Sequence, residues 1–201
     1  MIQTKSQFNT EDNRRDAIIS YLIWNKLAIK NLYNIDISRL KNNIDLIKNS
    51  LYPKSLDELI NCVKNLLANT DSNLPKMFNC LKWTKTKVDA KFVGTVMQRM
   101  GDLPQCALSG DLIDTANFVQ QNKSYNSSQY IEKLTKICGF LEEFPPILIY
   151  KSYKNRRKDK AKNIKYYIED GNHRALAYIL CGNTQFTAFI GSNKFLSIYR
   201  C

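Results

Sequence analysis

In the first third of the chain, apolar residues recur every three or four positions between polar ones, which is the spacing of one face of a helix. We therefore predict three amphipathic helices between Thr10 and Asn69. Pro53 ends the second, and Ser55-Leu56-Asp57-Glu58 predicts a capping box for the third. The apolar positions are Ala17, Ile18, Tyr21, Leu22, Trp24, Leu27 and Ala28, then Ile37, Leu40, Ile44 and Ile47, and finally Leu59, Ile60, Val63 and Leu66.

The pattern changes after a turn-rich stretch, Asn69 to Pro75. Phe92, Val96 and Met100 are spaced like one side of a helix, which predicts a helix over Val88–Met100. Beyond Leu103, short strand-like runs alternate with helix-like runs. We predict strands over Pro104–Ile113, Pro146–Tyr150, Ile164–Glu169 and Gln185–Gly191, and helices over Ser127–Cys138 and Ala175–Cys181, the latter stopped by Gly182.

This order of elements predicts an α+β fold. Residues 1–90 form an N-terminal helical accessory region in this interpretation. Residues 91–201 form a second domain with a small mixed sheet and flanking helices, whose strand ends are available for a site.

The net charge of +12 and the pI near 9.4 describe a chain that attracts polyanions such as nucleic acid or nucleotides. Solubility and a lysine-rich composition explain the same charge without any partner. Eight basic residues and a single acid fall within Lys151–Lys165, which we predict to be a hairpin tip. This segment is either a solvated loop or a contact for nucleic acid.

Six scattered cysteines form no CxxC pair, and the one histidine, His173, is not at ligand spacing from any of them, so we predict no zinc site. Several cysteines fall within apolar runs and are expected to be buried. The polar N-terminus shows no secretion signal, and no run reaches the roughly 20 apolar residues of a membrane span. We therefore expect a cytoplasmic protein without membrane contact.

The most informative segment is Asp170-Gly171-Asn172-His173-Arg174, which lies between a strand-like run and a helix-like run. A glycine turn there aims backbone N–H groups and the positive end of the helix dipole at one point, and Arg174 adds a fork of donors. This arrangement is typical of phosphate binding. The alternatives are that Asp170 or Asn172 is simply the helix N-cap, that Arg174 is a surface residue paired with Glu169, and that His173 is structural.

Together with the upstream Glu142-Glu143-Phe144-Pro145-Pro146-Ile147 and the strand pair that follows, this turn resembles the ParB/sulfiredoxin superfamily over roughly Leu103 to Gly191. The resemblance implies nucleotide binding, with phosphates seated on Gly171 to Arg174. Sulfiredoxins place their catalytic cysteine where Asn172 stands, and ParB proteins carry Glu and Arg where Asn172 and His173 stand. Free serine kinases, with an Asp-Gly-His-Thr-Arg box, and DndB-type proteins, with Asp-Gly-Gln-His-Arg, are more similar because both keep the acid that Asp170 provides.

A kinase-like interpretation of this resemblance assigns roles to individual residues. Asp170 orients the substrate or a metal ion, and ATP or another nucleotide binds with Mg²⁺ at Gly171, Asn172, His173 and Arg174. Lys136 meets a phosphate from the preceding helix, where the family's ATP-contacting face falls on Gln129, Glu132 and Lys136. Candidate bases are Asp111, Asp114, Glu142 and Glu143, and the predicted catalytic residues are Asp170, His173 and Glu143.

Three functions follow from these observations. The leading one is a nucleotide-binding enzyme, kinase-like or NTP-hydrolysing, that uses ATP or CTP. The second is a DNA- or RNA-binding regulatory protein, or a ParB-like nuclease, that uses Lys151–Lys165. The third is an interaction protein whose N-terminal helices bind a partner or a second copy.

Overall fold

A computed structural model describes residues 8–27, 37–70, 72–95, 101–104, 110–150 and 163–192. The fold is α+β, with the N-terminal helices first, as predicted. The chain divides into two compact units, Met1–Thr84 with Gly191–Cys201, and Lys85–Ile190. The sequence had placed a boundary after residue 90. No helix of the described part is long and apolar enough to cross a bilayer.

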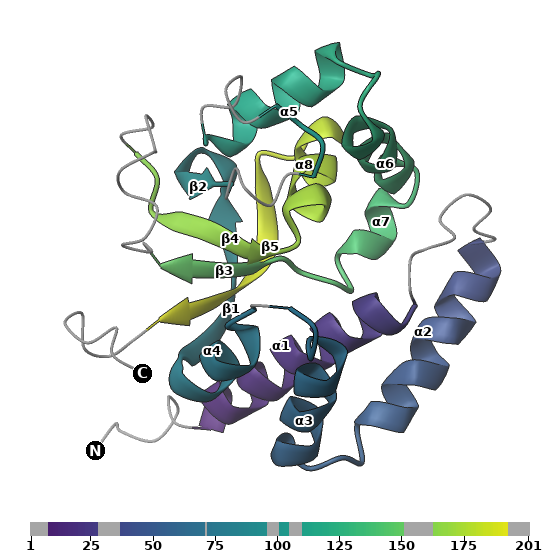
Figure 1. Ribbon diagram of the computed structural model, residues 1–201, viewed down its shortest axis with the longest axis vertical. Helices are drawn as coiled ribbons and strands as arrows, with labels where there is room; N and C mark the ends of the chain where they lie inside the picture. Colours follow the sequence, from purple (N-terminus) through teal and green to yellow (C-terminus); the bar gives the residue numbers. More distant parts are fainter. Residues whose placement is uncertain are drawn as a thin grey trace. The chain divides into compact units, whose positions relative to one another are not determined.

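The first unit contains α1 (Phe8–Lys26), α2 (Ile37–Leu51), α3 (Leu56–Leu66) and α4 (Leu74–Cys80) (Figure 1). The helices α2 and α3 both pack against α1, whose Ala17, Ile18 and Leu22 are buried. The three helices predicted before Asn69 are therefore confirmed. So is the capping box, because Ser55 Oγ accepts from the Glu58 N–H at 3.3 Å and Glu58 Oε2 accepts from the Ser55 N–H at 2.6 Å.

An aromatic cluster forms much of the core of this unit. The ring of Phe78, on α4, lies 5.2 Å from that of Trp83 and 6.0 Å from that of Tyr21. Trp83 and Phe78 are both fully buried. Neither α4 nor the strand that carries Trp83 was predicted from the sequence.

Five strands form one sheet in the order β1-β5-β3-β4-β2. They are β1 (Lys82–Asp89), β2 (Val93–Gly94), β3 (Ile147–Tyr150), β4 (Tyr166–Asp170) and β5 (Gln185–Ser192). The strands β3 and β4 are antiparallel, with Leu148 opposite Ile168, whereas β2 runs parallel to β4. The sheet is thus mixed, and the predicted positions of β3, β4 and β5 are confirmed.

Two elements were predicted wrongly. The stretch predicted as a helix over Val88–Met100 instead ends β1, makes a 3₁₀ turn at Ala90–Phe92 and continues as β2; residues 96–100 lie outside the described part. The strand predicted over Pro104–Ile113 is wrong at its end, because α5 (Leu112–Gln121) begins there; residues 105–109 lie outside the described part. Asp111 is the N-cap of α5, and its carboxylate accepts from the N–H groups of Ile113 at 2.8 Å and Asp114 at 3.2 Å.

The helix that carries the candidate site is α8 (Asn172–Leu180). It packs against α5, α6 (Asn126–Thr135) and α7 (Cys138–Leu141), which surround it in Figure 1. Ala175, Leu176 and Ala177 are buried in these contacts. Gly182, at φ +84°, stops the helix as predicted, and its N–H donates to the Ile179 carbonyl at 2.9 Å. The first turn of α8 is thereby fixed against the end of β4.

Candidate functional site

The predicted strand-to-helix turn joins β4 to α8. Gly171 is the N-cap residue of α8 and has a left-handed conformation, with φ +94° and ψ +25°. The helix begins at Asn172, three residues earlier than the sequence indicated, so that His173 and Arg174 belong to its first turn. Gly171, the N-cap residue, has no side chain that could cap this helix end. The first N–H groups of α8 are backbone donors at the positive end of the helix dipole.

Asp170 and Arg174 form an ion pair four residues apart across this turn. The Arg174 side chain is only 1% exposed, whereas that of Asp170 is 27% exposed. Both simpler interpretations of these residues are therefore wrong. Asp170 is not the N-cap of α8, and Arg174 is buried rather than a surface residue.

Gly171 makes room for the Arg174 guanidinium. A Cβ atom added at Gly171 would lie 2.7 Å from Arg174 Nη2 and 2.9 Å from Arg174 Nε, closer than non-bonded atoms approach. The guanidinium therefore lies directly against the backbone of the turn. Glycine is required here for two reasons, the positive φ and this close contact.

His173 is largely buried between its own helix and α6. The ring of Tyr130, on α6, meets the His173 ring edge to face, with centroids 5.3 Å apart and planes at 81°. Nε2 of His173 has no hydrogen-bond partner among the described residues. Burial lowers the pKa of His173, Arg174 lowers it further, and the charges of Asp170 and Asp102 only partly oppose this. The imidazole is therefore harder to protonate than that of an exposed histidine, and it is neutral at neutral pH.

Two residues of this neighbourhood, Tyr130 and Asp102, were missed by sequence reasoning. Burial raises the pKa of Tyr130 to about 12, so its hydroxyl stays protonated. The Asp102 carboxylate accepts from the N–H groups of Asn126 at 2.7 Å and Ser127 at 2.9 Å, capping α6 from outside the helix. These hydrogen bonds hold the pKa of the Asp102 carboxyl below its usual range, and those with Ser127 have the largest effect. No local motif marks either residue, since their partners are distant in the sequence.

Polar atoms are buried where α6 and α8 pack together. Asn172 Oδ1, Ser128 Oγ and the Tyr178 hydroxyl have no hydrogen-bond partner within the described ranges. Asn172 is 6% exposed and Ser128 is fully buried. Buried polar groups of this kind are normally satisfied by protein, water or a ligand. Of these atoms, Asn172 Oδ1 belongs to the turn, whereas Tyr178 lies further along α8 with its ring stacked on that of Phe186.

The remaining predicted residues precede the turn in the chain. Lys136 is exposed at the C-terminal end of α6, and Glu143 is exposed in the turn after α7. Gln129 and Glu132 are exposed as well, while the buried side of α6 carries Ser127, Ser128, Ile131 and Leu134. Most of the basic segment, residues 151–162, lies outside the described part. The roles of Lys136, Glu143 and this segment stay predictions.

The side chains were also tested for a metal site. Within the described ranges, no group of three or more histidine, cysteine or acidic side chains is placed to hold a metal ion. Asp170, the carboxylate nearest the turn, is paired with Arg174. These residues do not provide a protein-bound Mg²⁺ site, so the chemistry considered below includes no step through a metal.

Comparisons with known proteins were made at the level of families, of curated proteins and of solved structures. None of the three finds a match to this chain. The similarity to the ParB/sulfiredoxin superfamily therefore stays a prediction from the residues of the turn and of the Pro-Pro strand.

Proposed function

We propose that this chain binds the phosphate groups of a nucleotide, ATP or CTP, at the N-terminus of α8. The observation that supports the proposal is the first turn of α8, which begins at a left-handed Gly171 lying against the Arg174 guanidinium. Backbone N–H groups at a helix N-terminus bind phosphate through hydrogen bonds and the helix dipole. The buried, unpartnered Asn172 Oδ1 and His173 Nε2 give a ligand further polar groups to contact.

Arg174 has a different role in this proposal from the one expected from sequence. Because its side chain is 1% exposed and paired with Asp170, it contributes positive charge from beneath the turn. It also holds the backbone of Gly171 in place. We therefore regard Arg174 as a positioning residue, and the backbone of Asn172 and His173 as the phosphate contact.

Phosphoryl transfer or NTP hydrolysis is the chemistry that we propose for this site, since such reactions depend mainly on positioning and charge. His173 is the strongest candidate for the base, because burial keeps its imidazole neutral and able to accept a proton. Asp170 is engaged with Arg174, and Glu143 is exposed after α7. ATP-dependent turnover that is lost in His173→Gln would support this assignment.

Nucleotide binding should strengthen as the pH falls from 8 toward 6. A phosphate on the imidazole raises the pKa of His173 above its depressed value in the free chain. Nucleotide affinity is therefore highest below the pKa that His173 has in the free chain. It declines as the pH rises through the pKa that His173 has in the complex. If the pKa of His173 differs by one unit between the free chain and the complex, the nucleotide affinity changes by about tenfold in total. Calorimetry with ATP, CTP and ADP, with and without Mg²⁺, measures this affinity at each pH.

Two variants separate this prediction from a general effect of charge. His173→Gln should abolish the pH dependence while the fold, followed by circular dichroism, is kept. Lys48→Ala, which removes one cation from α2 in the other unit, should bind like the wild type. Absence of binding to any of the three nucleotides across this pH range would contradict the proposal.

A second function, nucleic-acid binding, is favoured by one specific cluster. The Phe92 ring lies beneath two lysines, with Lys165 Nζ at 3.9 Å and Lys91 Nζ at 5.0 Å from its centroid. Both lysines are exposed, and Lys165 ends the basic segment of the sequence. An aromatic ring among cations is a typical contact for a nucleic-acid strand. We infer that, if the chain binds nucleic acid, Lys91, Phe92 and Lys165 contact the strand.

Fluorescence anisotropy with a single strand and a duplex, each at several salt concentrations, provides that test. Removal of two phosphate contacts in Lys91→Gln/Lys165→Gln should reduce the slope of log affinity against log salt by about 1.4 for a single strand and 1.8 for a duplex. The matched control, Lys41→Gln/Lys123→Gln, removes two exposed cations elsewhere and should leave the slope unchanged. Equal slopes for both double variants would exclude the cluster as the contact.

A further inference from the structure

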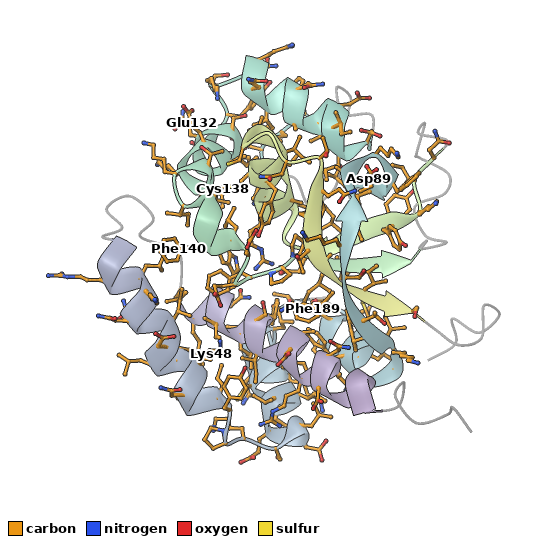
Figure 2. All side chains as sticks on the ribbon, turned by 180° about the vertical axis from the view of Figure 1, so that it is seen from behind. Lys48, Asp89, Glu132, Cys138, Phe140 and Phe189 are labelled. Carbon is orange, nitrogen blue, oxygen red and sulfur yellow. The ribbon has the colours of Figure 1, made fainter. Side chains whose placement is uncertain are left out.

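Two cysteines that are distant in the sequence lie side by side in the second unit. Cys138 is the first residue of α7, and Cys181 is the C-cap residue of α8 (Figure 2 labels Cys138). Their thiols are close enough to influence each other, because Cys181 raises the pKa of Cys138. Two further contacts link the same segments, because Cys181 Sγ lies 3.7 Å from the Thr135 carbonyl oxygen and Asn183 Nδ2 lies 4.0 Å from Cys138 Sγ. The packing of α7 on α8 thus brings the two sulfur atoms together.

The two thiols differ in accessibility. Cys181 is exposed, whereas Cys138 is half-buried. The sequence had suggested buried cysteines, but none of the four described ones is buried, and the other two described ones are Cys62 and Cys80. Burial raises the pKa of Cys138 to about 12, and the neighbouring Cys181 raises it as well. Cys181 is therefore the thiol that meets a reagent from solution, and Cys138 is the one positioned to react with the product.

We propose that Cys138 and Cys181 are a modification site, a dithiol that a hydroperoxide converts reversibly to a disulfide. In the first step the Cys181 thiolate attacks the hydroperoxide, the O–O bond breaks, and sulfenic acid forms while an alcohol, or water from hydrogen peroxide, leaves. In the second step Cys138 loses its proton and attacks the Cys181 sulfur, an S–S bond forms, the S–O bond breaks and water leaves. The two sulfurs together lose two electrons and two protons, and the hydroperoxide is reduced. A dithiol reductant restores both thiols by exchange.

The residues around Cys138 favour the second step, in which Cys138 attacks the Cys181 sulfenic acid. The Asn183 amide, which also donates to the Tyr178 carbonyl oxygen at 3.2 Å, is held beside Cys138 Sγ. Its N–H group stabilises the negative charge that appears on Cys138 as the proton leaves. The resulting bond would link α7 to the C-terminal end of α8, whose first turn is the candidate phosphate site. The proposal itself does not depend on that site.

Peptide mapping of the full chain under non-reducing conditions tests the proposal directly. Trypsin cuts after lysine and arginine, which places Cys138 alone in peptide 137–151 and Cys181 alone in peptide 175–194. After treatment of the folded protein with hydrogen peroxide, we expect one linked species of these two peptides, lighter by about 2 Da than their sum. Dithiothreitol should return it to the separate peptides.

Two variants distinguish the oxidation of Cys181 from the formation of the disulfide with Cys138. Cys138→Ser should leave Cys181 as a sulfenic acid that dimedone traps, whereas Cys181→Ser should leave Cys138 as an unmodified thiol at the same dose. Cys62→Ser, in the other unit, should form the same linked peptides as the wild type. A folded, oxidised wild type without the link between 137–151 and 175–194, or one in which Cys138 or Cys181 is linked to another cysteine instead, would overturn the proposal. The wild-type result decides it even where a variant fails to fold.

Discussion

Replacing Trp83 with alanine is expected to lower the free energy of unfolding by about 3 to 5 kcal/mol. Trp83 is fully buried, and its ring contacts that of Phe78, which in turn contacts Tyr21. The change removes the largest side chain of this aromatic cluster and leaves a cavity that neighbours fill only in part. Domains of this kind are stable by about 5 to 15 kcal/mol, so the loss is a large share of the total. Urea denaturation followed by circular dichroism measures it.

Two companion variants make the result specific to packing. Trp83→Phe should cost clearly less than Trp83→Ala, because it keeps an aromatic ring and also removes Nε1, a buried donor without a partner in the described part. Leu46→Ala, at a position 68% exposed, should change stability by less than about 0.5 kcal/mol. If Trp83→Ala costs no more than Leu46→Ala, the aromatic cluster does not form the core of this unit.

The sequence predicted those elements whose signals are local. The capping box of α3, the Gly182 stop of α8 and the runs that became β3, β4 and β5 are all set by residues within a few positions of one another. Propensity and caps act over this range, and here no tertiary contact opposed them. These elements were therefore predictable to within a few residues.

The elements that were missed depend on distant contacts or on ambiguous patterns. Strand β1 buries Trp83 and Val88 but exposes the four residues between them, so it lacks the alternation that marks a strand. It is also an edge strand of the sheet, a position where polar residues are common. The spacing of Phe92, Val96 and Met100 then predicted a helix where only burial against the rest of the fold could have excluded one.

The sequence pointed to the turn that forms the candidate site, but not to the side-chain contacts around it. Gly171 at a turn between strand and helix follows directly from the motif. The pairing of Arg174 with Asp170 was also predictable, since the two are four residues apart, yet the only partner considered was Glu169, in the alternative interpretation of Arg174. Tyr130 and Asp102 could not be found, because their relation to α8 depends on how α6 and its distant cap are placed. The sequence identifies the backbone feature, and packing decides which side chains accompany it.

Gly171→Ala is expected to destabilise the protein by about 2 to 4 kcal/mol, because two separate costs add. An L-residue at φ +94° is strained, at a cost of about 1 to 2 kcal/mol. The added Cβ would also lie 2.7 Å from Arg174 Nη2, the nitrogen that pairs with Asp170, so the guanidinium must move. An exposed arginine would move freely, but this side chain is 1% exposed and held by its partner.

Gly182→Ala provides the matched control at the other end of the same helix. Gly182 has φ +84°, and nothing lies within 4 Å of an added Cβ, so this variant reports the cost of the positive φ alone. We expect about 1 to 2 kcal/mol for it. The difference between the two variants measures the contact with Arg174, and chemical denaturation gives both values.

A double-mutant cycle with Arg174→Met isolates the same contact independently. Methionine keeps most of the apolar stem but removes the guanidinium, so Gly171→Ala in that background should cost only what Gly182→Ala costs. The coupling energy between positions 171 and 174 should then be about 1 to 2 kcal/mol, reduced from that of a fully buried pair because Asp170 is 27% exposed. Zero coupling would mean that the guanidinium does not lie against the turn. Arg174 could then no longer fix the backbone N–H groups of α8 on which phosphate binding depends, so this stability measurement also tests the basis of the proposed function.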